Sequence, residues 1–132
     1  MLYPKRYDLN PLILGYDWSF EFIYEVGGSP LDFTGYSMEM RVFDDYLSPY
    51  LGTWTSQGGE ITLGQDGHVK ILIKANNQHE LTIGMKKYVI ILTYPQDPES
   101  QEEPEAYPIL TGNLPVIDID GIIGEGGGGP IS

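Results

Sequence analysis

Two histidines and a group of C-terminal acids are the residues with which this sequence could carry out acid–base or metal chemistry. His68 directly follows a glycine turn, and His79 lies in a polar stretch. We expect both side chains to face solvent, which does not suit a general base held in an apolar pocket. The run Asp118-Ile119-Asp120-Gly121, followed by Glu125, offers oxygen ligands to a hard cation. It lacks the third Asp or Asn and the final Glu of a calcium loop, so we interpret it as solvated acids at a strand end.

Motifs for nucleophilic catalysis and phosphate binding are absent from the sequence. It contains no cysteine, no Gly-x-Ser-x-Gly elbow, no His-Glu-x-x-His motif and no P-loop. No helix-forming stretch follows the glycine run Gly126–Gly129, so this run does not match a phosphate-binding loop. We therefore expect no enzymatic activity, no cofactor and no structural metal.

The charge of the chain is strongly acidic and unevenly distributed. Seven Lys and Arg oppose nineteen Asp and Glu, for a formal net charge of −12. Residues 95–132 contain eight of these acids and no Lys or Arg. Because such a surface repels nucleic acid and anionic lipid, we expect neither as a partner. The sequence shows no signal-peptide pattern and no apolar run of about 18–20 residues, so we expect a protein made in the cytoplasm.

Alternating apolar and polar residues predict short β-strands that must position any functional side chain. The alternation is strict from Trp18 to Val26, whose apolar face is expected to lie on a core, and it recurs at Tyr36–Val42 and His68–Ala75. Lys87–Tyr94 is apolar on both faces, which predicts a central strand. The one helix candidate is a single turn within Asn76–Ile83.

Length and turn composition predict one all-β domain. The chain has 132 residues with 17 Gly and 10 Pro, which favours seven or eight short strands in an antiparallel β-sandwich over a small barrel. We expect this domain to span residues 1–120, with residues 1–11 as an extended arm that pairs at Lys5–Leu9. Residues 121–132 are expected to form a flexible glycine-rich tail. The predicted core includes Phe20, Phe22, Met40, Ile71, Ile73 and Ile90.

Aromatic residues offer a binding alternative. The chain has ten Tyr and two Trp, and Tyr46, Tyr50 and Trp54 gather around one predicted loop. Aromatic side chains on an exposed concave face would stack on sugars. Burial in a sandwich core accounts equally well for the aromatic residues of the predicted strands, and we favour burial over glycan binding.

The order of turns and strands resembles a known group of virion proteins. The most specific pieces are the link Leu31-Asp32-Phe33-Thr34-Gly35-Tyr36, the strand Met38-Glu39-Met40-Arg41 after it, and Gly58-Gly59-Glu60-Ile61-Thr62-Leu63. The accompanying pieces are Lys5–Leu9, Gly15–Phe20, Gly67–Ile71 and Tyr88–Thr93. Together they resemble, over residues 5–117, the immunoglobulin-like N-terminal domain of upper baseplate proteins of tailed bacteriophages. The resemblance implies an immunoglobulin-like sandwich with a turn between sheets at the first piece, a hairpin at the last, and no catalytic residues.

This resemblance leads to a functional expectation. We expect a non-enzymatic bacteriophage virion structural protein, an assembly or adaptor subunit of the tail, baseplate or neck. Its expected partners are copies of itself and other virion proteins. A capsid decoration (cement) protein and a host-glycan-binding module are the alternatives. Partner contacts are expected at the two ends and the aromatic loop, namely at Tyr3, Tyr7, Tyr46, Tyr50, Trp54, Ile122, Ile123 and Ile131.

Overall fold

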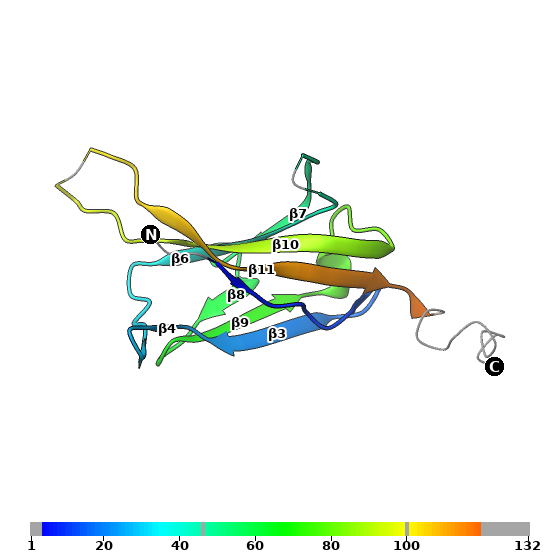
Figure 1. Ribbon diagram of the computed structural model, residues 1–132, viewed down its shortest axis with the longest axis horizontal. Coiled ribbons are helices and arrows are strands. Elements are labelled where there is room, and N and C mark those ends of the chain that lie inside the picture. Colours follow the sequence, from blue (N-terminus) through cyan, green and yellow to red (C-terminus); the bar gives the residue numbers. More distant parts are fainter. Residues whose placement is uncertain (1–3, 46, 100, 120–132) are drawn as a thin grey trace.

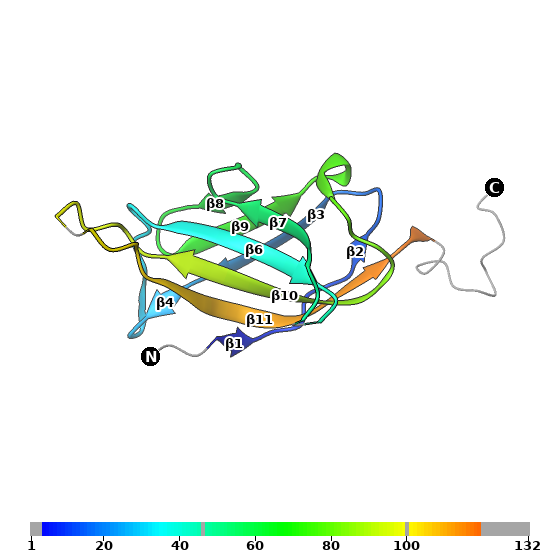
Figure 2. The same cartoon turned by 90° about the horizontal axis from the view of Figure 1, so that it is seen from above.

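Two facing β-sheets form the protein, in a sandwich-like arrangement (Figures 1 and 2). The computed structural model describes residues 4–45, 47–99 and 101–119. The larger sheet has the order β1–β11–β10–β6–β7, with β2 also paired to β11. Its strands are β1 (Lys5–Arg6), β2 (Leu12–Ile13), β6 (Ser37–Phe43), β7 (Tyr50–Thr55), β10 (Gly84–Thr93) and β11 (Ala106–Ile117).

The smaller sheet faces the larger one and has the order β3–β9–β8. Its strands are β3 (Trp18–Ile23), β8 (Ile61–Leu63) and β9 (His68–Ile73). A short hairpin of β4 (Glu25–Val26) and β5 (Ser29–Pro30) connects β3 to the link before β6. β1 and β2 run parallel to β11, and the other pairings are antiparallel.

Period-two alternation places one face of each long strand in the core. On β9, Val69 and Ile71 are fully buried while Lys70 between them is exposed. β10 lies between β6 and β11, which confirms the predicted central strand. Of its apolar residues, Ile90 is fully buried and Val89 is half-buried on the opposite face.

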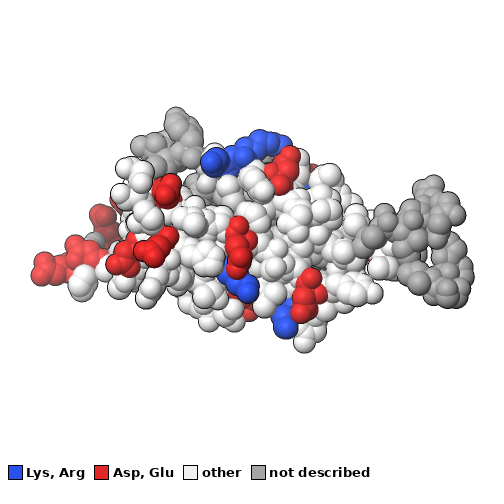
Figure 3. Space-filling view, turned by 90° about the horizontal axis from the view of Figure 1, so that it is seen from below, with Lys and Arg blue, Asp and Glu red and all other residues white. Residues whose placement is uncertain are grey.

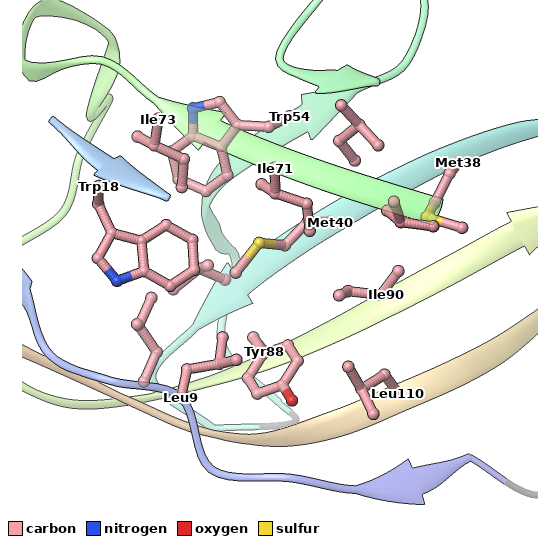
Figure 4. Close-up of a cluster of buried hydrophobic side chains, with 14 of the residues drawn as sticks. Leu9, Trp18, Met38, Met40, Trp54, Ile71, Ile73, Tyr88, Ile90 and Leu110 are labelled. Carbon is pink, nitrogen blue, oxygen red and sulfur yellow. The ribbon is translucent and has the colours of Figure 1, made fainter. Parts of the chain in front are cut away.

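The core fills the space between the two sheets (Figure 4). The smaller sheet contributes Trp18, Val69, Ile71 and Ile73, and the larger sheet contributes Met38, Met40, Trp54, Tyr88, Ile90 and Leu92. Burial of each large aliphatic side chain stabilises the fold by about 1.5–3 kcal/mol. The predicted burial of Met40, Ile71, Ile73 and Ile90 is confirmed, since each has 0% exposure. Phe20 and Phe22 are half-buried against the core, because β3 is an edge strand.

Three local expectations are corrected by the structure. Val26 was expected on the core face but is 47% exposed, because β3 ends at Ile23 and the chain turns through Gly27 into the β4–β5 hairpin. The single helical turn expected within residues 76–83 is a 3₁₀ turn, Ala75–Asn77. A helix cannot continue through His79, whose φ of 51° is left-handed.

The turn at Gly58-Gly59 also differs from the expected hairpin. It joins β7 in the larger sheet to β8 in the smaller sheet, so the chain crosses between sheets there. The hairpin follows instead, between β8 and β9. Asp66 and Gly67 both have positive φ, 56° and 74°, as a tight two-residue hairpin turn requires.

Strand segments in the described residues outnumber the seven or eight expected. There are eleven, but β1, β2, β4 and β5 contain only two residues each, which leaves seven of three residues or more. The last strand is continuous through Gly112 and Pro115, where interruptions were expected. Thr111 O and Asn113 O accept hydrogen bonds from the N-terminal segment, and because peptide groups alternate along a strand, the backbone of Pro115 faces the same side. Pro115 lies at the gap between β1 and β2, where no strand needs the N–H that proline lacks.

We expect the Ile71→Ala substitution to lower the free energy of unfolding by about 2–5 kcal/mol, because it leaves a cavity between the sheets. Chemical denaturation followed by tryptophan fluorescence measures this loss. The matched control is Thr62→Ala on neighbouring β8, where the side chain is exposed and the loss should stay below about 1 kcal/mol. Equal effects of the two substitutions would contradict the described core.

Candidate functional site

The N-terminal segment is an edge strand of the larger sheet. Tyr7 N donates to Thr111 O at 2.8 Å and Leu9 N donates to Asn113 O at 2.9 Å. Leu9 is 4% exposed and takes part in the core. The expected pairing at Lys5–Leu9 is thus present. The expectation that this arm reaches out to neighbouring subunits is corrected for the residues from Lys5 onward, because their backbone hydrogen bonds go to the same chain.

Two residues allow the segment to lie close to β11. Gly112 has φ of 157°, and a Cβ at this position would overlap the carbonyl oxygen of Tyr7. The buried Tyr88 hydroxyl donates a hydrogen bond to the same oxygen. In Figure 4 the Tyr88 hydroxyl points toward this segment. Burial raises the pKa of Tyr88 above its ordinary value, so the hydroxyl remains a donor.

An apolar groove lies between this segment and β3. It has a volume of about 450 Å³ and a wall of aromatic rings. The Tyr7 and Phe20 ring centroids are 5.6 Å apart, and those of Phe20 and Phe22 are 5.5 Å apart. Ile109 and Leu110 of β11 line it as well, and Lys5, Glu21 and Glu25 stand among its lining residues. The groove therefore offers a long apolar slot with charges of both signs around it.

The groove borders the edge of β3 that has no strand partner among the described residues, where β3 pairs with β9 alone. Tyr24 N donates to Gly67 O on the β9 side. Successive peptide groups of a strand point to opposite sides, so those of Ser19, Glu21 and Ile23 point to the open edge. No described residue donates to or accepts from them. Peptide groups left in this way are a template for another strand.

A second, smaller hollow lies on the outer face of the larger sheet. Its volume is about 310 Å³, and Phe43, Tyr50 and Val89 line it. The Arg41 guanidinium lies 4.9 Å from the centre of the Tyr50 ring, and its Nε lies 2.6 Å from Glu39 Oε2. Tyr50 is thus held in place by Arg41 within its own sheet.

The residues expected to contact partners do not converge on one surface. Tyr7 is 52% exposed at the groove and Tyr50 is 53% exposed on the other hollow. Trp54 is corrected: it is fully buried, its indole N–H donates to Asn77 O at 2.8 Å, and its ring lies against Gly52. The remaining expected contacts lie outside the described residues, namely Tyr3, Tyr46, Ile122, Ile123 and Ile131.

Sequence reasoning missed the groove itself, although it named Tyr7, which lines the groove, among the partner contacts. Phe20 and Phe22 were assigned wholly to the core, and Ile109 and Leu110 were not singled out. The period-two pattern shows which side chains share a face. The pattern does not show which strands lie beside β3. Phe20 and Phe22 remain half-exposed because, among the described residues, β9 is the one strand beside β3.

Titratable side chains are spread over the described surface. His68 and His79 are both exposed, as expected. His68 Nε2 lies 3.9 Å from Glu21 Oε1. Within residues 4–45, 47–99 and 101–119, no three His, Cys, Asp or Glu side chains gather in a way that could hold a metal ion. Asp120 and Glu125, which were weighed as calcium ligands, lie outside this part of the chain.

Lys86 of β10 is a basic residue that does not lie at the surface. Lys86 is 4% exposed, and its Nζ donates to Asp44 Oδ1 at 2.8 Å and Thr82 Oγ1 at 3.0 Å. Lys86 therefore forms an ion pair within the fold, and its charge does not attract a partner protein. Figure 3 shows acidic side chains gathered at the end of the molecule formed by the loop between β10 and β11, and separate acidic and basic side chains over the middle of this face.

No protein-family model matches the chain, and no curated protein matches it. In the part of the chain that is described, no helix has the length and apolar character needed to cross a membrane.

Removal of the Tyr88 hydroxyl tests how the segment is held. We expect Tyr88→Phe to lower the free energy of unfolding by about 1–3 kcal/mol, because Tyr7 O loses its side-chain donor. Amide hydrogen exchange at Tyr7 and Leu9 should become faster. Tyr107→Phe is the matched control, since that hydroxyl donates to exposed Glu105. Unchanged exchange in Tyr88→Phe would show that the segment is held by other contacts.

Proposed function

We propose that this chain is a non-enzymatic structural protein of a tailed-bacteriophage virion, an assembly or adaptor subunit of the tail, baseplate or neck. The observation that supports this most directly is the strand order. In an immunoglobulin-like sandwich, the third, sixth and seventh strands share one sheet, and the second, fourth and fifth share the other. When the short β4–β5 hairpin is left out of the count, β6, β10 and β11 correspond to the third, sixth and seventh strands, and β7 is an additional strand of their sheet. β3, β8 and β9 correspond to the second, fourth and fifth strands.

The link at residues 31–36 supports the same assignment. Asp32 Oδ1 accepts hydrogen bonds from Thr34 N at 3.0 Å and Thr34 Oγ1 at 2.7 Å, which lower the pKa of Asp32. Gly35 has a left-handed φ of 83°. This turn leads from the β4–β5 hairpin to β6 in the larger sheet. A turn between sheets at this position is what the resemblance to baseplate proteins implies.

The surface chemistry also suits an assembly protein. The described residues offer an aromatic groove and an open strand edge, both of which bind polypeptide through apolar and main-chain contacts. Glycan binding is less well supported, because Trp54 is buried and Tyr50 is packed against Arg41 and Phe43.

Composition of purified particles tests the proposal. Mass spectrometry of density-gradient-purified virions of the phage that encodes this sequence should detect the chain in several copies per particle. Immunogold labelling in the electron microscope then separates a tail, baseplate or neck position from the capsid surface expected of a decoration protein. A chain that is abundant in the lysate but absent from purified particles would refute a virion role.

Deletion of residues 121–132 tests the expected role of the tail. We expect the melting temperature of the isolated protein to change by less than about 2 °C, because the core residues lie between Leu9 and Val116. Incorporation into virions should fall severalfold. Unfolding of the truncated protein would show that the tail belongs to the core, and normal incorporation would show that the tail has no role in assembly.

A further inference from the structure

The open edge of β3 is the least protected strand edge of the described residues. Natural edge strands are usually short or carry Lys, Pro or bulges that prevent pairing. β8 is only three residues long, and β1 consists of Lys5 and Arg6 next to Pro4. On the edge strand β7, Leu51 O accepts a hydrogen bond from Glu80 N, and Thr55 N donates one to Glu60 Oε1. β3 has six residues without Lys, Arg, Pro or Gly. Its open peptide groups therefore suit an incoming strand.

The side chains along this edge need cover on two faces. On the inner face, Phe20, Phe22 and Tyr24 are half-buried and line the groove. On the outer face, Ile23 is 61% exposed. A strand placed beside β3 would insert alternate side chains into the groove and lay the others beside Ile23. A segment that fits this edge therefore has apolar residues at two adjacent positions and small residues on either side of them.

We propose that β3 accepts, as an added strand, the C-terminal segment around Ile122 and Ile123 from a second copy of this chain. The sequence Gly121-Ile122-Ile123-Gly124 has two adjacent branched apolar residues between glycines. One isoleucine enters the groove and its neighbour covers Ile23, because consecutive residues of a strand face opposite sides. The inference rests on the proposed assembly function and names the segment that links the copies.

The geometry of β11 favours a second copy over the same chain. β11 carries the chain from Ile109, which lines the groove, to Ile117, roughly 26 Å farther along the sheet. Ile122 follows five residues later and can lie at most about 18 Å from Ile117. Within one chain, Ile122 therefore cannot return to the level of Ile109. The later residues of the tail can, but Gly126–Gly129 have no side chains to fill an aromatic groove, and Ile131 stands between Pro130 and Ser132 without a second isoleucine to cover Ile23.

Electrostatics are compatible with this occupant. The whole chain carries a net charge of −12, so two copies repel each other at long range. Residues 121–124 carry no charged side chain, and the nearest acids are Asp120 and Glu125. Lys5, Glu21 and Glu25 are the charged residues that line the groove. Pairing of main-chain groups and burial of isoleucine supply the attraction that net charge does not.

Cysteine cross-linking between full-length chains tests the proposal, since the natural sequence contains no cysteine. Chains with Ile23→Cys, at the β3 edge, are mixed with ¹⁵N-labelled chains that carry Ile123→Cys and are allowed to oxidise. The matched control replaces Ile23→Cys by Thr53→Cys, which is also exposed on an edge strand, β7. We expect the disulfide between unlike chains to form at least about tenfold faster with Ile23→Cys, because docking raises the effective concentration.

Several outcomes would overturn the proposal. Equal rates for the two edge positions would show that the tail does not choose β3. Predominant Ile23→Cys homodimers would show that β3 pairs with β3 of the second copy. Disulfides that form only within one chain, in a doubly substituted Ile23→Cys and Ile123→Cys protein diluted to nanomolar concentration, would assign the groove to the chain's own tail.

Sedimentation velocity gives an independent readout that does not need cysteines. We expect Ile122→Asp to weaken self-association at least about tenfold, whereas Ser132→Asp, which adds the same charge near the end of the tail, should leave it nearly unchanged. Equal effects of the two substitutions would show that the tail influences self-association only through its net charge. No effect of either substitution would refute the docking of the tail on β3. These experiments use purified protein, so they can fail while the chain is found in virions, and they can succeed while it is not.

Discussion

The parallel pairing of the N-terminal segment with β11 is the constraint on which the rest of the arrangement depends. It requires Gly112, because any side chain there would meet the Tyr7 carbonyl, and it is reinforced by the buried Tyr88 hydroxyl. Since Leu9 and Leu12 then enter the core, the segment contributes to the larger sheet and not to the smaller one. β3 is thereby left with a single neighbour.

The groove and the open edge of β3 both result from the pairing of the N-terminal segment with the larger sheet. In an immunoglobulin-like sandwich, the first strand lies beside the second strand, in the sheet that corresponds to the smaller sheet of this protein. Here that place beside β3 has no strand from the described residues, and the rings of Phe20 and Phe22 are covered from one side only. An apolar surface of this kind, next to unpaired peptide groups, is suited to a polypeptide strand and poorly suited to a small polar ligand.

Charge and apolar surface have separate roles in this molecule. The excess of acids, much of it between β10 and β11, keeps copies apart at long range and opposes non-specific association. Association then depends on places where apolar contact outweighs the repulsion, and the aromatic groove beside β3 is such a place. Lys86 shows the same separation within the fold, because it is neutralised by Asp44 and presents no charge to a partner.

The sequence by itself determined the all-β class, the presence of strands within Trp18–Val26, Tyr36–Val42, His68–Ala75 and Lys87–Tyr94, and the burial of Met40, Ile71 and Ile90, because alternation with period two depends only on neighbouring residues. It placed Tyr7 among the partner contacts but also Trp54, since sequence distinguishes apolar from polar faces and not exposed from covered ones. Only the tertiary structure decided that Trp54 packs against Gly52, and that the chain crosses between sheets at Gly58-Gly59. The tertiary structure likewise decided that β3 keeps an open edge, because the choice of a strand's neighbours depends on contacts between residues far apart in the chain, such as Tyr7 with Tyr88 and Gly112.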